Sequence, residues 1–199
     1  GSMAEYVQEG DHMRVYELNP LVVTLAEEHF PYLRQSHVPV DIEVGDGLLL
    51  LQDSNHTYDI LTIDAFSGDA IPLNLMTLEA IHVYLEHLSP DGVLAFHITN
   101  RYFALAPILG RAMTEMGLFG AVVKKQPAQE DTLHHPDKSG FADNWVVVLS
   151  RNKAPVDTLI ENMDWTPLEC DGGKAWTDDT SNSLEALLIL RQWMGWPVF

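Results

Sequence analysis

The chain has 199 residues, with 11 lysines and arginines against 29 aspartates and glutamates, and a formal net charge of −18. This length is typical of a single domain, predicted to span residues 1–199, and the 46% of hydrophobic residues argue against a disordered chain. The acidic balance excludes an ordinary nucleic-acid-binding protein, because neutralising phosphates requires a basic surface. It is compatible with a cationic partner, and equally with a charge that only keeps the protein soluble.

Two further features bear on the compartment. No apolar run reaches the roughly 18 residues of a membrane span, so none is predicted in this chain. The single cysteine, Cys170, forms no internal disulfide, which favours a reducing compartment. We therefore predict a cytoplasmic protein, either free-standing or the soluble domain of a longer or membrane-anchored chain.

Short β-branched runs alternate with helical patterns, which is typical of an α/β fold with a mostly parallel sheet. The expected strands lie at residues 13–18, Val40–Val44, 58–64, 93–98, 118–124 and Asn144–Ser150. The strand at 58–64 has the composition of the most buried one, and 89–92 (SPDG) is expected to be a turn. The last two strands are expected to pair antiparallel, and the polar segment 125–143 between them to form an excursion or lid.

The expected helices lie at residues 20–30, 75–88, 102–116, 156–163 and 183–193. Asn19 followed by Pro20 is a typical helix start, and Gly117 a typical helix end. The apolar residues 193–199 (WMGWPVF) either pack on the sheet or form an oligomer contact, so a homodimer remains one of two alternatives.

The first residues admit two interpretations. A doubly wound nucleotide-binding sheet opens with a strand and a glycine-rich turn. Gly1 and Ser2 are either a cloning remnant before a start methionine at Met3, or the last turn of such a loop with a helix over 3–9 after it. We favour the second, because the strand at 13–18 is one that a first helix would precede. The first strand of the sheet is then expected to be missing from this sequence.

Three acidic residues follow expected strands, at the edge where open α/β sheets bind ligands. Glu17 is placed to accept both hydroxyls of a ribose, and Asp46, between two glycines, to accept from an adenine amine. Asp64 ends the strand at 58–64. A helix cap is the alternative for each residue alone, whereas the three together favour a nucleoside site.

Several segments resemble the spermidine/spermine synthase (polyamine aminopropyltransferase) family, in particular the branch often fused to membrane transporter-like segments. They are residues 16–20 (YELNP), 45–47 (GDG), 58–72 (YDILTIDAFSGDAIP), 88–94 (LSPDGVL) and 176–182 (WTDDTSN). The resemblance implies a Rossmann-like class I methyltransferase fold, with a mostly parallel doubly wound sheet and an antiparallel last strand. The segment from Asp64 to Pro72 is longer than the family's Asp-x-x-Asp-Pro loop, and we do not expect the family's small N-terminal β-domain within this sequence.

The same resemblance implies a transferase that uses decarboxylated S-adenosylmethionine as co-substrate and a polyamine as acceptor. It implies Glu17 on the ribose, Asp46 and Gly47 at the adenine, and Asp64 as catalytic base and electrostatic anchor. The residues implied to contact the donor are Gly1, Ser2, Glu17, Asp46, Gly47, Asp64 and Ala65. A protonated polyamine must lose a proton before its nitrogen can attack, and a carboxylate is suited to orienting the ammonium and accepting that proton.

Other candidate residues carry weaker signals. Asp69, Asp178 and Asp179 are candidates for the distal ammonium of the amine, with a solvated acidic turn as the alternative for the last two. No metal site is predicted, since His82 and His87 do not share a helical face. Residues 66–68 (FSG) lack the Gly-x-Ser-x-Gly pattern of serine hydrolases.

Three functional hypotheses follow. The first is an aminopropyltransferase-like enzyme. The second is a methyltransferase that uses S-adenosylmethionine itself. The third is a non-catalytic ligand-sensing or interaction domain of the same fold.

Overall fold

The computed structural model describes residues 2–66, 71–100, 103–125, 144–181 and 183–187. They form an α/β fold, which confirms the predicted class, and the chain divides into two compact units, Gly1–Asn55 and His56–Phe199. The single domain over 1–199 stays a prediction. In the described ranges no helix is both long and apolar enough to cross a membrane.

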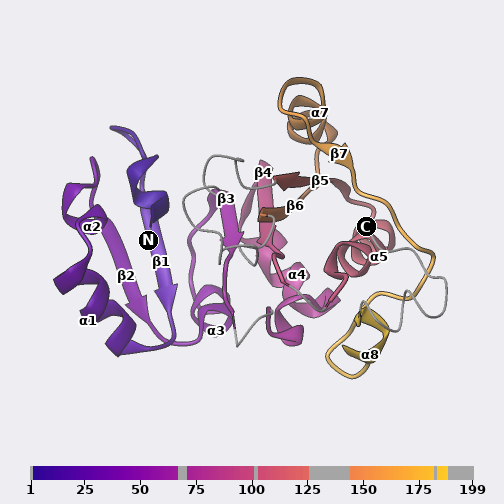
Figure 1. The fold of residues 1–199 in the computed structure, drawn as a ribbon, viewed down its shortest axis with the longest axis horizontal. Helices are drawn as coiled ribbons and strands as arrows, with labels where there is room; N and C mark the ends of the chain where they lie inside the picture. The colour runs from indigo at the N-terminus through magenta and orange to yellow at the C-terminus, as the bar shows by residue number, and fades with distance from the viewer. Residues whose placement is uncertain (1, 67–70, 101–102, 126–143, 182, 188–199) are drawn as a thin grey trace, which may run out of the picture. The chain divides into compact units, whose positions relative to one another are not determined.

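The first unit contains a two-stranded parallel sheet (Figure 1). Strand β1 (Met13–Glu17) pairs with β2 (Val40–Val44), in the predicted positions, with Met13 opposite Val40 and Glu17 opposite Val44. Its helices are α1 (Pro20–His29) and α2 (Tyr32–Gln35), which connect the two strands, and α3 (Gly47–Gln52), which follows β2.

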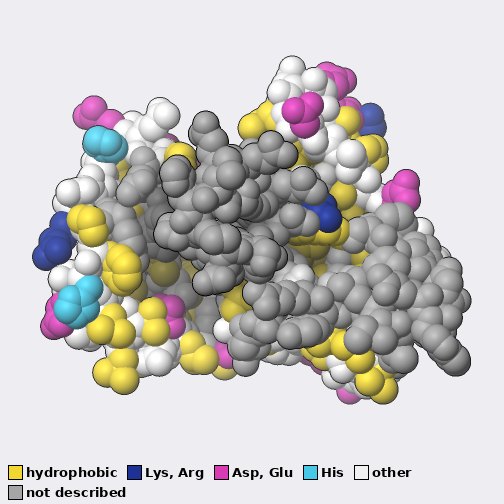
Figure 2. Space-filling model, viewed as in Figure 1, with side chains coloured by type: hydrophobic (Ala, Val, Ile, Leu, Met, Phe, Trp, Pro, Cys, Tyr) yellow, Lys and Arg dark blue, Asp and Glu magenta, His cyan; other side chains and the backbone are white. Residues whose placement is uncertain are grey.

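Helix α1 begins where the sequence predicts, because the Asn19 side chain accepts a hydrogen bond from the backbone N–H of Leu21 at 3.0 Å. None of its residues is buried. Hydrophobic side chains lie on the surface over this helix (Figure 2), among them Val22 and Leu25.

The start of the chain differs from the expected helix over 3–9. Residues Ser2–Glu5 form a short 3-10 helix, η1, and the chain then turns. The Asp11 carboxylate accepts a hydrogen bond from the backbone N–H of Gln8, and Gly10 has a φ of 101°. Such a turn requires a positive φ, which glycine adopts at no steric cost, and a helix over 3–9 does not form.

The second unit contains a five-stranded sheet in the order β3-β4-β6-β5-β7 (Figure 1). Strands β3 (Tyr58–Ile63) and β4 (Leu88–His97) are parallel. The predicted antiparallel pair is confirmed: β5 (Phe119–Lys125) runs against β6 (Asn144–Ser150), and β6 lies between β4 and β5. The short strand β7 (Thr166–Pro167) pairs with β5.

Strand β3 is confirmed in position but is not the most buried strand. Leu61 is buried, whereas the side chain of Ile60 is 65% exposed. The reason is its place in the sheet, since β3 has β4 as its one hydrogen-bonded neighbour in the part of the chain that the structure describes.

The turn predicted at residues 89–92 is also corrected, since these residues belong to β4. Tyr58 pairs with Leu88 and Ile60 with Val93, so four residues of β4 lie opposite one residue of β3 as a bulge. The Ser89 hydroxyl donates to the Asp59 carboxylate at 2.8 Å and anchors the bulge. Turn residues are thus accommodated inside a strand.

The helices of the second unit follow the predicted order. They are η2 (Leu73–Leu75), α4 (Leu78–Glu86), α5 (Leu105–Met116), α7 (Lys153–Asn162) and α8 (Ser183–Ala186). Helix α4 begins later than predicted because the Thr77 side chain caps it, and α5 ends at Gly117, which has a φ of 67°. The remainder of the helix predicted at 183–193, the apolar residues 193–199, and residues 126–143 of the expected lid lie outside the described residues.

The core of this unit lies between the sheet and helices α4 and α5. Its fully buried side chains include Ile81, Leu94, Phe96, Ile108, Leu109, Leu149 and Trp176. Trp176 is thus a core residue, the role that its aromatic bulk favours over a cation-binding cage.

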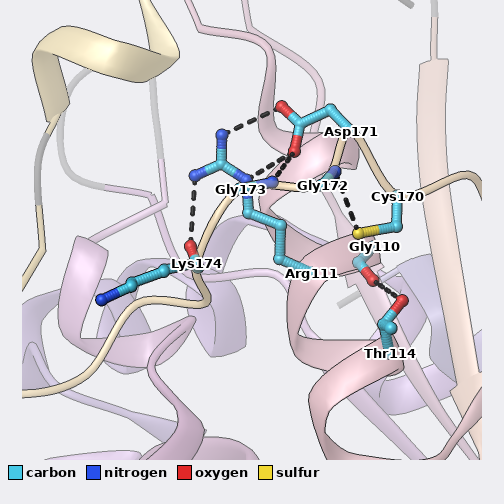
Figure 3. Close-up of polar contacts among 8 residues, drawn as sticks. All are labelled: Gly110, Arg111, Thr114, Cys170, Asp171, Gly172, Gly173 and Lys174. Atoms are coloured by element: carbon cyan, nitrogen blue, oxygen red, sulfur yellow. Dashed lines mark hydrogen bonds and ion pairs between the residues drawn. The ribbon is translucent and has the colours of Figure 1, made fainter.

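A buried ion pair links the segment after β7, around residues 169–174, to helix α5 (Figure 3). The Arg111 guanidinium donates to both carboxylate oxygens of Asp171, at 2.6 and 2.9 Å, and to the backbone carbonyl of Lys174 at 3.2 Å. The side chains of Arg111 and Asp171 are 4% and 6% exposed. Gly110 allows this segment to approach α5, because a Cβ there would clash with the carbonyl oxygen of Glu169.

Candidate functional site

In the first unit, the residues predicted to bind a nucleoside meet at the carboxyl edge of the β1–β2 sheet. Glu17 lies opposite Val44 at the end of the ladder, and the backbone N–H of Gly45 donates to the Glu17 carbonyl oxygen at 2.9 Å. The turn that carries Asp46 and Gly47 therefore begins beside Glu17. This is the edge at which open α/β sheets bind ligands.

Asp46 has a structural role in this turn. Its Oδ1 accepts hydrogen bonds from the backbone N–H groups of Leu48 at 3.0 Å and Leu49 at 3.2 Å, which caps helix α3. Gly47 is the first residue of that helix, and a Cβ there would lie 3.2 Å from the Cβ of Tyr16. The helix cap considered as an alternative for Asp46 is present, and the glycine allows α3 to approach β1.

The Glu17 side chain also accepts a hydrogen bond from the nearby backbone. Its Oε1 accepts from the backbone N–H of Asn19 at 2.8 Å, immediately before helix α1. A ribose bound at this carboxylate would share it with that N–H group. The side chain is therefore fixed in place by the same turn that starts α1.

In the second unit, Asp64 follows β3 and is hydrogen-bonded to a histidine at the end of β4. Ile63 pairs with Phe96, so the next residues along the two parallel strands, Asp64 and His97, lie side by side. The His97 Nδ1 and Asp64 Oδ1 atoms are 2.6 Å apart. The two side chains are 31% and 61% exposed, so this polar pair is accessible to solvent.

An aromatic side chain lies against the pair. The rings of Phe66 and His97 are in edge-to-face contact with centroids 5.2 Å apart. Ala65, between Asp64 and Phe66, is exposed. The segment that carries the proposed catalytic aspartate therefore turns an aromatic ring towards its histidine partner.

Sequence reasoning missed His97, although a signal for it was present. The strand expected at 93–98 ends at this residue, and the carboxyl ends of neighbouring parallel strands meet at one edge of a sheet. A histidine at the end of one strand and an aspartate at the end of the next are thus candidates for contact.

The residues predicted to bind the amine differ in the contacts that they make. Asp178 fastens its segment to helix α4: its Oδ1 accepts from the Thr77 hydroxyl at 2.8 Å, and its N–H donates to Glu79 Oε2 at 3.0 Å. Asp179 is exposed, and Asp69 lies outside the described residues, as does Gly1 of the predicted donor loop. Ser2 is the first residue of η1.

A hollow of about 590 Å³ in the first unit contains none of the predicted site residues. It is lined by Tyr6, Val7, Gln8, Glu9 and His37. Tyr6 is 75% exposed, so we regard this hollow as an open surface depression and do not assign it to the site. Within the described ranges, no three histidine, cysteine or acidic side chains are grouped as a metal site.

Comparison with known proteins supports the predicted resemblance. No family model matches the chain. It is 34% identical over 96 residues to a polyamine aminopropyltransferase of Vibrio vulnificus, covering 47% of this chain and 31% of that protein. It is 31% identical over 84 residues to a probable polyamine aminopropyl transferase of Bifidobacterium longum, covering 41% of this chain and 18% of that protein. Part of this chain is thus homologous to polyamine aminopropyltransferases.

Solved structures show the same fold. A probable spermidine synthase from Corynebacterium glutamicum has a TM-score of 0.61 at 19% identity, over 90% of this chain and 69% of that chain. Human methyltransferase-like protein 13 in complex with SAH has a TM-score of 0.52 at 14% identity, over 71% of this chain and 61% of that chain. The fold is therefore of the class I methyltransferase type. The chain spans less than a third of the length of the Vibrio and Bifidobacterium relatives.

Proposed function

We propose that this chain carries the transferase site of a polyamine aminopropyltransferase. The substrates would be decarboxylated S-adenosylmethionine as donor and a polyamine as acceptor. The observation that carries the proposal is the Asp64 carboxylate at the carboxyl end of β3, hydrogen-bonded to His97 at 2.6 Å, in a chain homologous to polyamine aminopropyltransferases.

Asp64 is the proposed catalytic carboxylate. A carboxylate that is 61% exposed is accessible to a cationic acceptor, which it would orient by charge while favouring loss of the proton from the attacking nitrogen. The nitrogen then forms its bond to the aminopropyl carbon as the C–S bond breaks, and the electron pair stays on sulfur. In this reaction a sulfonium becomes a neutral thioether.

The proposed donor site is the edge of the β1–β2 sheet. Glu17 would accept from the ribose hydroxyls, and Asp46 with Gly47 would lie at the adenine. Ser2 and Ala65 remain proposed donor contacts. Asp179 remains a proposed contact of the distal ammonium, and Asp178 would contribute alongside its bond to Thr77.

Two measurements test the proposal. Calorimetry should give an affinity for decarboxylated S-adenosylmethionine at least tenfold higher than for S-adenosylmethionine. Mass spectrometry of reactions with a polyamine should detect the aminopropylated product. A preference for S-adenosylmethionine with methylated products would favour a methyltransferase, and binding of neither donor would leave an interaction domain.

The variant Asp64→Asn separates catalysis from binding. Because the neutral amide has no negative charge with which to orient the ammonium or to stabilise the loss of its proton, we expect turnover to fall by roughly 10²–10⁴-fold with donor affinity unchanged. Asp59→Asn is the matched control, since Asp59 lies on the same strand and contacts Ser89. Full turnover in Asp64→Asn would refute the proposed role of Asp64.

A further inference from the structure

The His97–Asp64 pair carries an inference beyond the proposed transfer and rests on it. We infer that His97, through its Nε2 atom, is the group that takes the proton from the attacking amine, while Asp64 orients the imidazole and balances its charge. Sequence reasoning gave this residue no role.

The hydrogen bond determines which ring nitrogen is available. An ionised carboxylate only accepts hydrogen bonds, so in the 2.6 Å contact the His97 Nδ1–H group donates to Asp64 Oδ1. In the neutral ring the other nitrogen, Nε2, then carries the lone pair. This is the arrangement in which a carboxylate holds a histidine in the tautomer of a general base.

Proton affinity also favours the imidazole over the carboxylate. Free imidazole binds a proton roughly 400-fold more tightly than a free aspartate-type carboxylate. An alkylammonium is almost entirely protonated at neutral pH, so the affinity of the proton acceptor matters. Transfer to an imidazole is therefore less unfavourable by that factor. The imidazolium that forms is adjacent to the Asp64 carboxylate, whose negative charge stabilises it.

The proton and electron balance is complete with the proposed adenosyl-sulfonium donor. The N–H bond of the acceptor ammonium breaks and its proton moves to His97 Nε2. The freed lone pair forms the N–C bond, the C–S bond breaks, and its electrons leave with the thioether sulfur.

In the part of the chain that the structure describes, Asp64 is the charged side chain that contacts His97. On β6, Val146 lies opposite His97, and the ring of Phe66 contacts the imidazole. The preceding residue on β4, Phe96, is fully buried beside Tyr84 of α4. Among the described residues, Asp64 is the titratable side chain hydrogen-bonded to His97.

The test uses His97→Asn in the full chain. The asparagine Nδ2 group replaces the Nδ1–H donor to Asp64 but cannot take up a proton. We expect kcat to fall at least 10²-fold with donor affinity unchanged, and the pH profile of kcat to differ from that of the wild type. His87→Asn is the matched control, because His87 Nδ1 bonds the backbone carbonyl of His56 at 2.9 Å, and it should keep wild-type turnover.

A second readout needs no turnover. Nitrogen-15 NMR of the His97 ring, assigned with the His97→Asn variant, should show the neutral tautomer protonated at Nδ1, and Asp64→Asn should reduce its population. A neutral His97 ring that carries its proton on Nε2 would overturn this inference but not the proposed function. The same holds if His97→Asn keeps the wild-type kcat and pH profile. A wild-type chain that transfers no aminopropyl group would overturn the proposed function, and this inference with it.

Discussion

Removing one partner of the Arg111–Asp171 pair should destabilise the second unit strongly. In Asp171→Ala, the Arg111 guanidinium, whose side chain is 4% exposed in the wild-type structure, loses two charge-assisted hydrogen bonds to a carboxylate. Leaving one partner of a buried pair uncompensated costs about 3–5 kcal/mol. That is a large part of the 5–15 kcal/mol by which folded domains are typically stable.

Urea denaturation followed by tryptophan fluorescence measures this loss. All five tryptophans lie after residue 144, so their fluorescence reports on the second unit. With a urea m-value of about 2 kcal/mol/M, the expected loss lowers the midpoint by about 1.5–2.5 M. Asp157→Ala is the control, because it breaks the exposed Lys153–Asp157 pair and should leave the midpoint almost unchanged.

A double variant tests the physical cause. If the loss comes from an uncompensated buried charge, replacing Arg111 by Met in the Asp171→Ala background should recover much of the stability. A midpoint for Asp171→Ala equal to that of Asp157→Ala would refute the reasoning. So would a double variant that is no more stable than Asp171→Ala.

Two further predictions concern backbone approach and donor binding. Gly110→Ala should cost about 2–3 kcal/mol in the same urea assay, because its Cβ would meet the backbone of Glu169. Gly172→Ala, with open space around it, should cost only about 1 kcal/mol for its φ of 79°. Equal losses in the two variants would contradict the clash. Asp46→Ser should keep helix α3 capped, measured by circular dichroism, yet weaken donor binding about 10–150-fold in calorimetry, since a hydrogen bond to a charged group is worth about 1.5–3 kcal/mol. Unchanged affinity would leave Asp46 as a helix cap alone.

Local patterns predicted much of this fold because the physics behind them is local. Asn19 caps α1 and Gly117 ends α5 through contacts within a few residues, and the alternating pattern of Val40–Val44 is that of a strand. The predicted turn at residues 89–92 was wrong because the Asp59 carboxylate, 30 positions away from Ser89, stabilises a bulge there. No local pattern contains that contact.

The candidate site shows the same division. Carboxylates at strand ends were predicted one by one, and Glu17 and Asp46 do lie at one edge of the first sheet. The His97–Asp64 contact depends on the register that sets Ile63 opposite Phe96, which tertiary pairing decides. Which strands become neighbours is a property of the assembled sheet, whereas the cap that Asp46 gives helix α3 is a local contact.

The position of β6 has a consequence for the order in which the second unit folds. Strand β6 is inserted between β4 and β5, although both of these precede it in the chain. During synthesis, a nascent chain that has emerged only as far as β5 exposes the β4 edge that Leu94 and Phe96 later share with β6. Because these pairings join residues about 50 positions apart, loop closure opposes them, and sheet completion waits for residues 144–150. The second unit should therefore depend on chaperones more than a sheet built from consecutive hairpins.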